Sequence, residues 1–141
     1  MATKLSITNF PTGYQTLITN GKHAVVGDEP LTSKGTDLGF SPPELLLSGI
    51  AMCKVATVRY IARKNGWEIG NVDAELTQQT TRKEDGKLST KISTAIKIEG
   101  SLSEDQKREL LSEADKCYVV RMIEGDWEIE HAVEFKEEIA A

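Results

Sequence analysis

Residues 41–67 read SPPELLLSGIAMCKVATVRYIARKNGW, and this stretch decides the fold of the chain. Ser41 is typical of a helix N-cap, the proline after it suits the first helical position, and Glu44 completes a capping box. Gly66 is typical of the residue that stops a helix. The sequence therefore predicts one long helix that runs to about Asn65.

The predicted helix changes character along its length. From Leu45 to Cys53 it is apolar on nearly every side, which is the pattern of a helix buried in the middle of a fold. Its second half is amphipathic and ends in cations at Arg59, Arg63 and Lys64. Positive charge in the last turn complements the dipole of a helix, so this end needs no nucleic-acid partner to explain it.

Short strands are predicted before the helix. Alternating apolar residues indicate strands at 4–8, 14–19 and 23–26, and Asn20-Gly21 is a strong hairpin signal. The segment Gly27–Phe40 then forms a loop of about 14 residues, which is long enough to suggest a binding or functional role.

After the helix, alternation predicts two long strands, around 72–76 and 88–98, joined by Glu84–Lys87 with its Asp-Gly turn signal. Ser103 and Gln106 form a second capping box, which begins a helix leading into Cys117. Alternation from Trp127 to Lys136 predicts a last strand. This element order indicates an α+β fold with antiparallel sheets in a single domain over residues 1–141.

The composition is that of an ordinary globular protein, with 39% hydrophobic and 28% charged residues among 141. The formal charge of −5 argues against a nucleic-acid surface. We found no signal-peptide pattern and expected no stretch to approach the roughly 18–20 apolar residues of a membrane span. The sequence therefore predicts a cytoplasmic protein that is not in a membrane.

Two cysteines are the candidate reactive groups. Cys53 lies inside the long helix, twelve residues after Ser41, where the helix dipole cannot activate it. Cys117 follows the second helix. If the thiols meet, the protein is a dithiol redox protein; if they do not, both are core residues, since free cysteine is among the most buried residue types. The spacing is not C-x-x-C, so a zinc or thioredoxin motif is not indicated.

Other polar groups are weaker candidates. Glu44 stands nine residues before Cys53, about 13.5 Å along a regular helix, so a capping role is at least as well supported as a site role. His131, Trp67 and Trp127 fit packing positions in strands. A hydrolase-like pair of Cys53 and His131 has nothing to orient it, and two histidines make a metal site improbable.

The order of these features resembles the OsmC/Ohr family of thiol-dependent hydroperoxide reductases. The features are an N-terminal meander, Pro-Pro-Glu-Leu-Leu-Leu opening a central helix that carries a cysteine, a long hairpin, and Leu-Ser-Glu-Asp-Gln leading to a second cysteine. The resemblance extends over roughly Lys4 to Phe135. It is most specific in residues 41–53 and 102–121.

The resemblance implies an interlocked homodimer whose antiparallel sheets wrap two long central helices, with active sites at the interface. Cys53 matches the peroxidatic cysteine, Cys117 the resolving cysteine, and Glu44 the site glutamate of the broader OsmC-like branch. In this chemistry Cys53 becomes a sulfenic acid and then a disulfide with Cys117, and an external dithiol such as a lipoylated protein reopens the disulfide. No metal, flavin or haem is needed, and the apolar lining suits organic hydroperoxides.

The chain departs from the peroxidase branches at two positions. Pro43 stands where the organic hydroperoxide branch has its glutamate, and no arginine precedes Arg59, although those branches hold the thiolate with an N-terminal arginine. Lys22 or Lys34 could supply a point charge instead, without the planar fork of arginine. The alternative is therefore a small-molecule-binding or redox-sensing dimer of the same fold with weak or no peroxidase activity.

Overall fold

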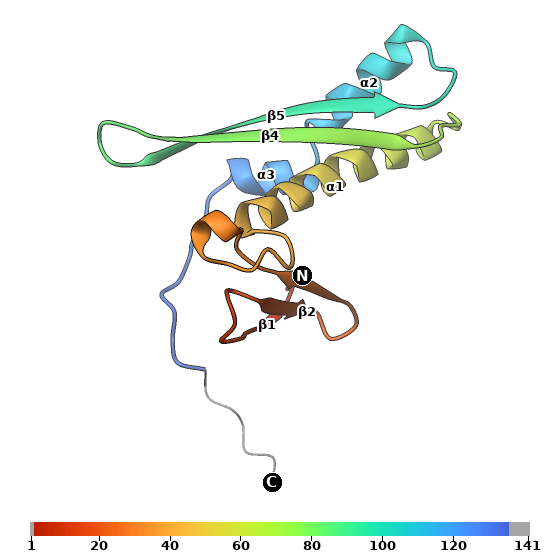
Figure 1. Cartoon of the computed structure of the whole chain (residues 1–141). Helices are drawn as coiled ribbons and strands as arrows, with labels where there is room; N and C mark the ends of the chain where they lie inside the picture. Colours follow the sequence, from red (N-terminus) through yellow and green to blue (C-terminus); the bar gives the residue numbers. More distant parts are fainter. Residues whose placement is uncertain (1, 136–141) are drawn as a thin grey trace.

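Helix α1 (Pro42–Lys64) links the two parts of the structure, a computed structural model that describes residues 2–135 (Figure 1). Before α1 comes a small antiparallel sheet with strands in the order β1 (Ser6–Asn9), β2 (Thr16–Thr19) and β3 (Ala24–Gly27). A short 3₁₀ turn, η1 (Leu31–Ser33), lies in the loop between β3 and α1. This sheet is located at the N-terminal end of α1.

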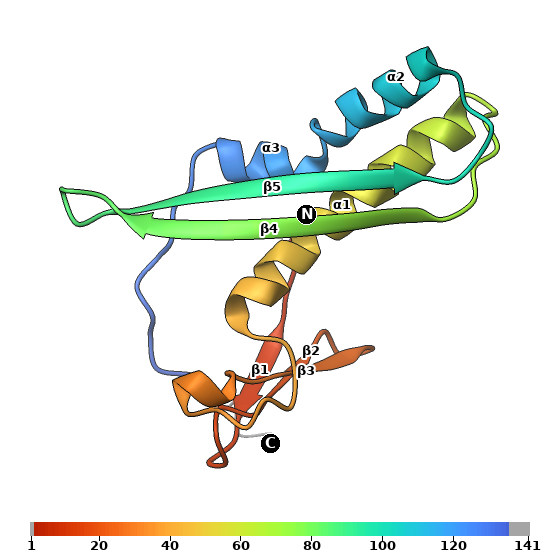
Figure 2. The same ribbon diagram turned by 45° about the horizontal axis from the view of Figure 1, so that its top comes forward.

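A long antiparallel hairpin and two helices follow α1. Strand β4 (Val72–Arg82) pairs with β5 (Leu88–Ile98) along its full length, from Val72 opposite Ile98 to Arg82 opposite Leu88. Helices α2 (Glu104–Ala114) and α3 (Tyr118–Glu124) come next. Figure 2 shows α2 alongside the C-terminal half of α1, and the β4–β5 hairpin runs along the same side of α1 as α2. The α+β class with antiparallel sheets is therefore confirmed.

Local signals set the ends of the elements as predicted. The Ser41 hydroxyl accepts a hydrogen bond from the Glu44 N–H at 3.4 Å, and the Glu44 carboxylate accepts one from the Ser41 N–H at 3.0 Å. The helix ends before Gly66, whose φ of +70° is unfavourable for other residues. Ser103 and Gln106 form the second capping box at the start of α2.

The core lies between the C-terminal half of α1 and α2. Val58 and Ala62 of α1 pack against Leu110 and Ala114 of α2, and all four side chains are fully buried. Half-buried apolar residues surround them: Ile61, Trp67, Ile69, Val72, Ile96, Ile98 and Leu102. Burying a leucine side chain contributes roughly 1.5–3 kcal/mol, so this small cluster supplies much of what holds α2 on α1.

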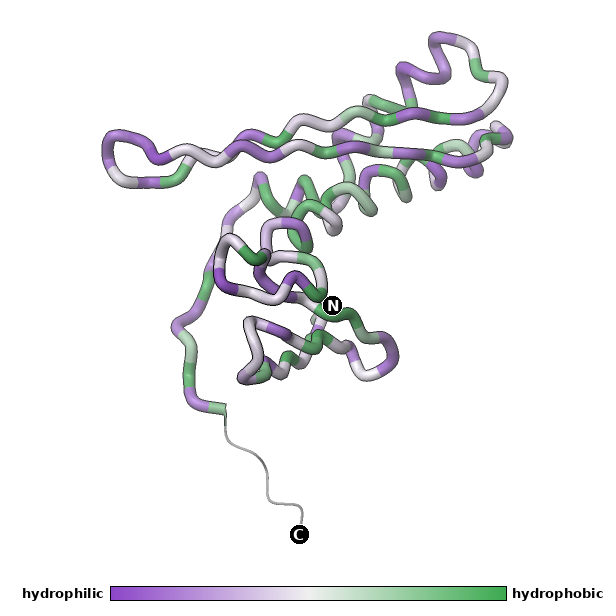
Figure 3. The backbone as a smooth tube through the Cα atoms, viewed as in Figure 1, coloured by the Kyte–Doolittle hydropathy of each residue, from purple (hydrophilic) through white to green (hydrophobic). Residues whose placement is uncertain are grey.

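The N-terminal half of α1 is mostly exposed within this chain, with Ile50 as a buried exception, contrary to the prediction of a helix buried on nearly every side. Leu46 is 58% exposed and Met52 is 73% exposed. Figure 3 shows apolar colour along this part of the helix, whereas the tip of the β4–β5 hairpin is polar. The apolar pattern correctly predicts a helix with apolar side chains that another element should bury, but within the described chain most of these side chains are exposed.

The expectation that no stretch approaches a membrane span is also wrong. Helix α1 is long and apolar enough by that criterion, with a mean hydropathy of 1.5 over its most apolar 18 residues. Core helices of soluble proteins meet the same criterion, and α1 packs against α2, α3 and β4. The criterion alone is therefore weak evidence for a membrane segment.

The predicted last strand does not form in the described part of the chain. Residues 126–135 pair with no strand there, and Trp127 and His131 are exposed instead of packed. Lys136, the end of the predicted strand, lies outside the described residues. Alternation predicts a strand, but a strand also requires a partner edge, and these residues have none within the described chain.

We expect Leu110→Ala to lower the free energy of unfolding by about 2–5 kcal/mol, because it opens a cavity in the α1–α2 cluster. Urea denaturation followed by circular dichroism measures this loss. Leu111→Ala on the same helix is the matched control, since Leu111 is 41% exposed and its loss should cost less than about 1 kcal/mol. Equal losses in both variants would contradict the placement of the core.

Candidate functional site

Cys53 and Cys117 lie 3.7 Å apart, although 64 residues separate them in the sequence. Cys53 is half-buried in the middle of α1, and Cys117 is 1% exposed at the N-cap of α3. Both thiols are free. The sequence left open whether the two cysteines meet, and the fold brings them together.

The junction between α2 and α3 places Cys117 against α1. Helix α2 ends at Ala114, and the Cys117 N–H donates to the Ala114 carbonyl at 3.3 Å. The Cys117 carbonyl then accepts from the Arg121 N–H at 3.0 Å as α3 begins. Since Ala114 belongs to the α1–α2 core, the packing that holds α2 also fixes the position of Cys117.

Two consecutive main-chain N–H groups of α3 point at the two thiols. The Val119 N–H donates to the Cys53 sulfur at 3.4 Å, and the Val120 N–H donates to Cys117. A hydrogen-bond donor facing sulfur stabilises negative charge on it. Helix α3 was not predicted from the sequence, and its amides are the functional groups that sequence reasoning missed.

The Cys117 thiol is subject to opposing influences. Burial raises the pKa of Cys117 above its ordinary value, and contact with the Cys53 thiol raises this pKa further. The Val120 N–H and the positive charge of Lys54 lower it, without cancelling the effect of burial. Cys117 is therefore suited to react after Cys53, once its partner has been oxidised.

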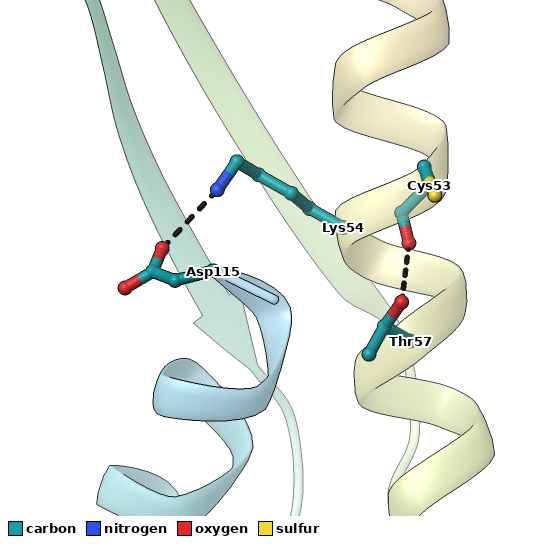
Figure 4. Close-up of polar contacts among 4 residues, drawn as sticks. All are labelled: Cys53, Lys54, Thr57 and Asp115. Carbon is teal, nitrogen blue, oxygen red and sulfur yellow. Dashed lines mark hydrogen bonds and ion pairs between the residues drawn. The ribbon is translucent and has the colours of Figure 1, made fainter. Parts of the chain in front are cut away.

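Lys54 directly follows Cys53 in the sequence, and it is buried. Its ammonium group lies 3.1 Å from an Asp115 carboxylate oxygen (Figure 4). The same view shows the Thr57 hydroxyl donating to the Cys53 carbonyl at 2.8 Å, a bond within α1. Lys22 and Lys34, the substitutes considered from sequence, are exposed and are not among the charges that shift the pKa of Cys117.

Glu44 is placed away from the thiols within this chain. Its carboxylate is held in the capping box at the start of α1, about 13.5 Å along the axis from Cys53 by helical rise. Hydrogen bonds from the Ser41 backbone and side chain lower the pKa of Glu44, so it stays ionised. In a single chain Glu44 is a capping residue, as its sequence position allowed.

Asp28 organises the loop Gly27–Phe40. Its carboxylate accepts hydrogen bonds from four backbone N–H groups and one hydroxyl: Tyr14 N, Glu29 N, Thr36 N, Leu38 N and Thr36 Oγ1. Burial alone would raise the pKa of Asp28, but these hydrogen bonds together hold it well below its usual range. The loop is therefore folded around a buried carboxylate.

An apolar pocket of about 550 Å³ lies beside this loop, between the small sheet and the start of α1. Ile7, Ile18, Phe40 and Leu45 contribute to its lining, and neither cysteine does. The thiol pair is thus separate from this pocket. Among residues 2–135, no group of three or more His, Cys, Asp or Glu side chains is placed to hold a metal ion.

Comparison with known proteins identifies the family to which this chain belongs. Residues 35–132 match the family profile described as OsmC-like protein. No curated protein matches the chain.

Solved structures match over most of the chain. An OsmC-like protein from Mycoplasma pneumoniae is 24% identical, with a TM-score of 0.72 over 89% of this chain and 90% of its own. A Psychrobacter arcticus protein named for an osmotic stress and detoxification response is 22% identical, with a TM-score of 0.73 over 86% and 88%. The organic hydroperoxide resistance protein OhrB of Bacillus subtilis is 17% identical, with a TM-score of 0.66 over 87% and 92%. These likenesses show the fold.

We expect Asp28→Asn to lower the melting temperature at pH 7, because an amide cannot accept all the hydrogen bonds that this carboxylate accepts. The folded pKa of Asp28 lies below its ordinary value of 3.8, so its contribution to stability is present above that pH and is lost as pH falls below it. In thermal melts from pH 7 to pH 2, the melting temperatures of the wild-type protein and of Asp28→Asn should therefore converge below about pH 4. A difference in melting temperature that stays constant at every pH would contradict the stabilising role of the Asp28 carboxylate.

Proposed function

The chain belongs to the OsmC-like family, and we propose that it is a two-cysteine peroxidase that reduces organic hydroperoxides to alcohols. The observation that carries this proposal is the approach of Cys53 and Cys117 to 3.7 Å from distant parts of the sequence. Two thiols at that distance can form a disulfide after a small adjustment, since a disulfide bond is about 2.05 Å long.

The more accessible thiol acts first. The Cys53 thiolate attacks the distal oxygen of the hydroperoxide, the O–O bond breaks, and the alkoxide leaves with a proton as the alcohol. Two electrons pass from sulfur to the peroxide, and Cys53 becomes a sulfenic acid. The Val119 N–H, 3.4 Å from this sulfur, supports its negative charge before the attack.

The buried thiol completes the oxidation. Cys117 attacks the sulfur of the sulfenic acid, an S–S bond forms, the S–O bond breaks, and water leaves. An external dithiol then reduces the disulfide by two exchange steps and returns both cysteines to thiols. This cycle requires a dithiol reductant and no bound cofactor.

The surroundings of Cys53 favour organic hydroperoxides over hydrogen peroxide. The half of α1 that carries Cys53 exposes apolar side chains, among them Leu46 and Met52. Apolar surface next to the thiol gains free energy from contact with an alkyl group, roughly 25 cal/mol for each Å² buried. The organic hydroperoxide resistance proteins among the similar structures agree with this substrate class.

The active form in this proposal is a homodimer. The most apolar window of α1 is only 22% buried in one chain. Ile129, Val133 and Phe135, in the unpaired residues 126–135, are almost fully exposed. A second copy that covers α1 and pairs with this segment would bury both. Glu44 would then act at the thiols only from the second copy, because its own helix holds it too far away.

A second candidate function is ligand binding or redox sensing by the same dimer. The observation that favours it is the set of influences on Cys117, where burial outweighs the Val120 N–H and Lys54 and leaves the pKa raised. No arginine precedes Arg59 to activate the thiols. In this function the dithiol would oxidise slowly and would report on redox state instead of turning over.

Hydroperoxide turnover tests the proposed function. Reduced protein with dihydrolipoamide should consume cumene hydroperoxide at least about tenfold faster than hydrogen peroxide, because only the organic substrate gains from the apolar surface. Cys53→Ser should abolish turnover. Cys117→Ser should allow one round of oxidation, which leaves a sulfenic acid that dimedone labels.

Background-level consumption by the wild-type protein would overturn the peroxidase and favour the binding or sensing function. Turnover that survives in Cys53→Ser would show that the assigned nucleophile is wrong.

Sedimentation equilibrium tests the dimer. The wild-type protein should sediment as two 15.5 kDa chains, and Met52→Asp should weaken the association at least about tenfold by placing a charge in the covered face. Ser112→Asp, which adds the same charge to an exposed position on α2, is the control and should leave the dimer intact. A monomer at all concentrations in the wild-type protein would contradict the proposed assembly.

A further inference from the structure

We propose that Lys54 is a positioning residue for Cys117: its ion pair with Asp115 holds Cys117 against Cys53, and its charge supports the Cys117 thiolate. The inference rests on the proposed function in one respect, the assignment of Cys117 as the thiol that closes the disulfide. Its physical content, the control of disulfide formation by Lys54, can be tested without any hydroperoxide.

The ion pair spans the same two parts of the chain as the thiol contact. Lys54 directly follows Cys53 in α1, and Asp115 precedes Cys117 by two residues at the end of α2. Figure 4 shows the Lys54 side chain reaching from α1 across to Asp115, where the charged groups meet at 3.1 Å. Each partner thus lies within two residues of one cysteine, and the pair fixes how the two backbones approach.

The burial of the two partners is unequal. The Lys54 side chain is 10% exposed, whereas the Asp115 side chain is 79% exposed. Withdrawing an ammonium group from water is costly, and an apolar residue of similar size would pack at this position without that cost. The carboxylate, in contrast, keeps most of its hydration. The buried ammonium group of Lys54 is thus paired with Asp115, and its positive charge also acts on Cys117.

The charge acts on Cys117. The groups that influence Cys117 are Cys53 and Lys54 from α1 and the Val120 N–H from α3, and Lys54 is the cation among them. Burial opposes ionisation of Cys117, while the Val120 N–H and, to a smaller extent, the positive charge of Lys54 favour the thiolate needed for attack. Asp115 orients the ammonium group, and because it is mostly hydrated it neutralises the charge only in part.

The step that Lys54 assists is the closing of the disulfide. The Cys117 thiolate attacks the Cys53 sulfenic sulfur, the S–S bond forms, and the hydroxyl group leaves and takes a proton to become water. The same charge assists disulfide formation by diamide, in which two thiols lose two protons and two electrons and diamide becomes a hydrazine. In both reactions the more accessible Cys53 reacts first and the Cys117 thiolate then attacks its sulfur, so the thiolate fraction of Cys117 governs the closing step.

The test measures disulfide formation by diamide in the reduced full-length protein. Lys54→Met should slow it several-fold, because it removes both the ion pair with Asp115 and a charge that favours the Cys117 thiolate. Lys54→Arg should retain most of the wild-type rate, since it keeps the charge. Asp115→Asn should slow the reaction several-fold while folding normally, because Asp115 is exposed. Lys116→Met removes an exposed lysine from the same turn and should leave the rate unchanged.

A second measurement separates the effect of the Lys54 charge from a structural effect of the substitution. In a Cys53→Ser background, thiolate absorbance titrates Cys117 alone, and Lys54→Met should move its midpoint to higher pH while Lys54→Arg should not. Circular dichroism confirms folding of each variant. If Lys54→Met does not fold, Asp115→Asn and Lys54→Arg still decide, because both keep a cation in place.

The outcomes are distinct. A wild-type rate of disulfide formation in Lys54→Met or in Asp115→Asn would overturn the inference, and so would equal slowing in Lys116→Met. If the wild-type protein consumes no hydroperoxide but its diamide oxidation still depends on Lys54, the proposed function fails and the role of Lys54 stands.

Discussion

The packing of α2 against the C-terminal half of α1 is the interaction on which the site depends. Val58, Ala62, Leu110 and Ala114 are fully buried against one another, and they anchor the end of α2. The chain then turns within three residues to Cys117, which reaches the sulfur in the middle of α1. This apolar contact, together with the Lys54–Asp115 ion pair, holds two thiols that are 64 residues apart in the sequence at 3.7 Å.

The environment of the thiol pair balances burial against a few directed charges. Burial makes ionisation of Cys117 costly, while the Val120 N–H group of α3 and the ammonium group of Lys54 favour it. The ammonium group of Lys54 is a point charge without the planar fork of arginine, so it cannot hold two partners in a fixed geometry as an arginine can. Lys54 acts through its ion pair with Asp115 and through its positive charge, so its effect is expected on the resolving thiol, Cys117.

Local signals predicted much of the fold, and long-range contacts decided the site. The Ser41 and Ser103 capping boxes and the Asn-Gly and Asp-Gly turns are each complete within a few residues, so sequence alone placed α1, α2 and the hairpins. The contact between Cys53 and Cys117, the α3 amides and the burial of Lys54 depend on tertiary packing, which no local pattern encodes. The predicted strand does not form over the described residues 127–135 for the same reason: alternation shows one apolar face but does not supply a partner edge.

The most direct test of the account is peptide mapping after one equivalent of cumene hydroperoxide is added to the reduced protein. The two-cysteine mechanism predicts one dominant product, a disulfide that links the Cys53 and Cys117 peptides of the same chain, with the loss of two hydrogens and one equivalent of alcohol formed. Two reduced cysteines and unreacted hydroperoxide would contradict it, and so would a disulfide found only between chains.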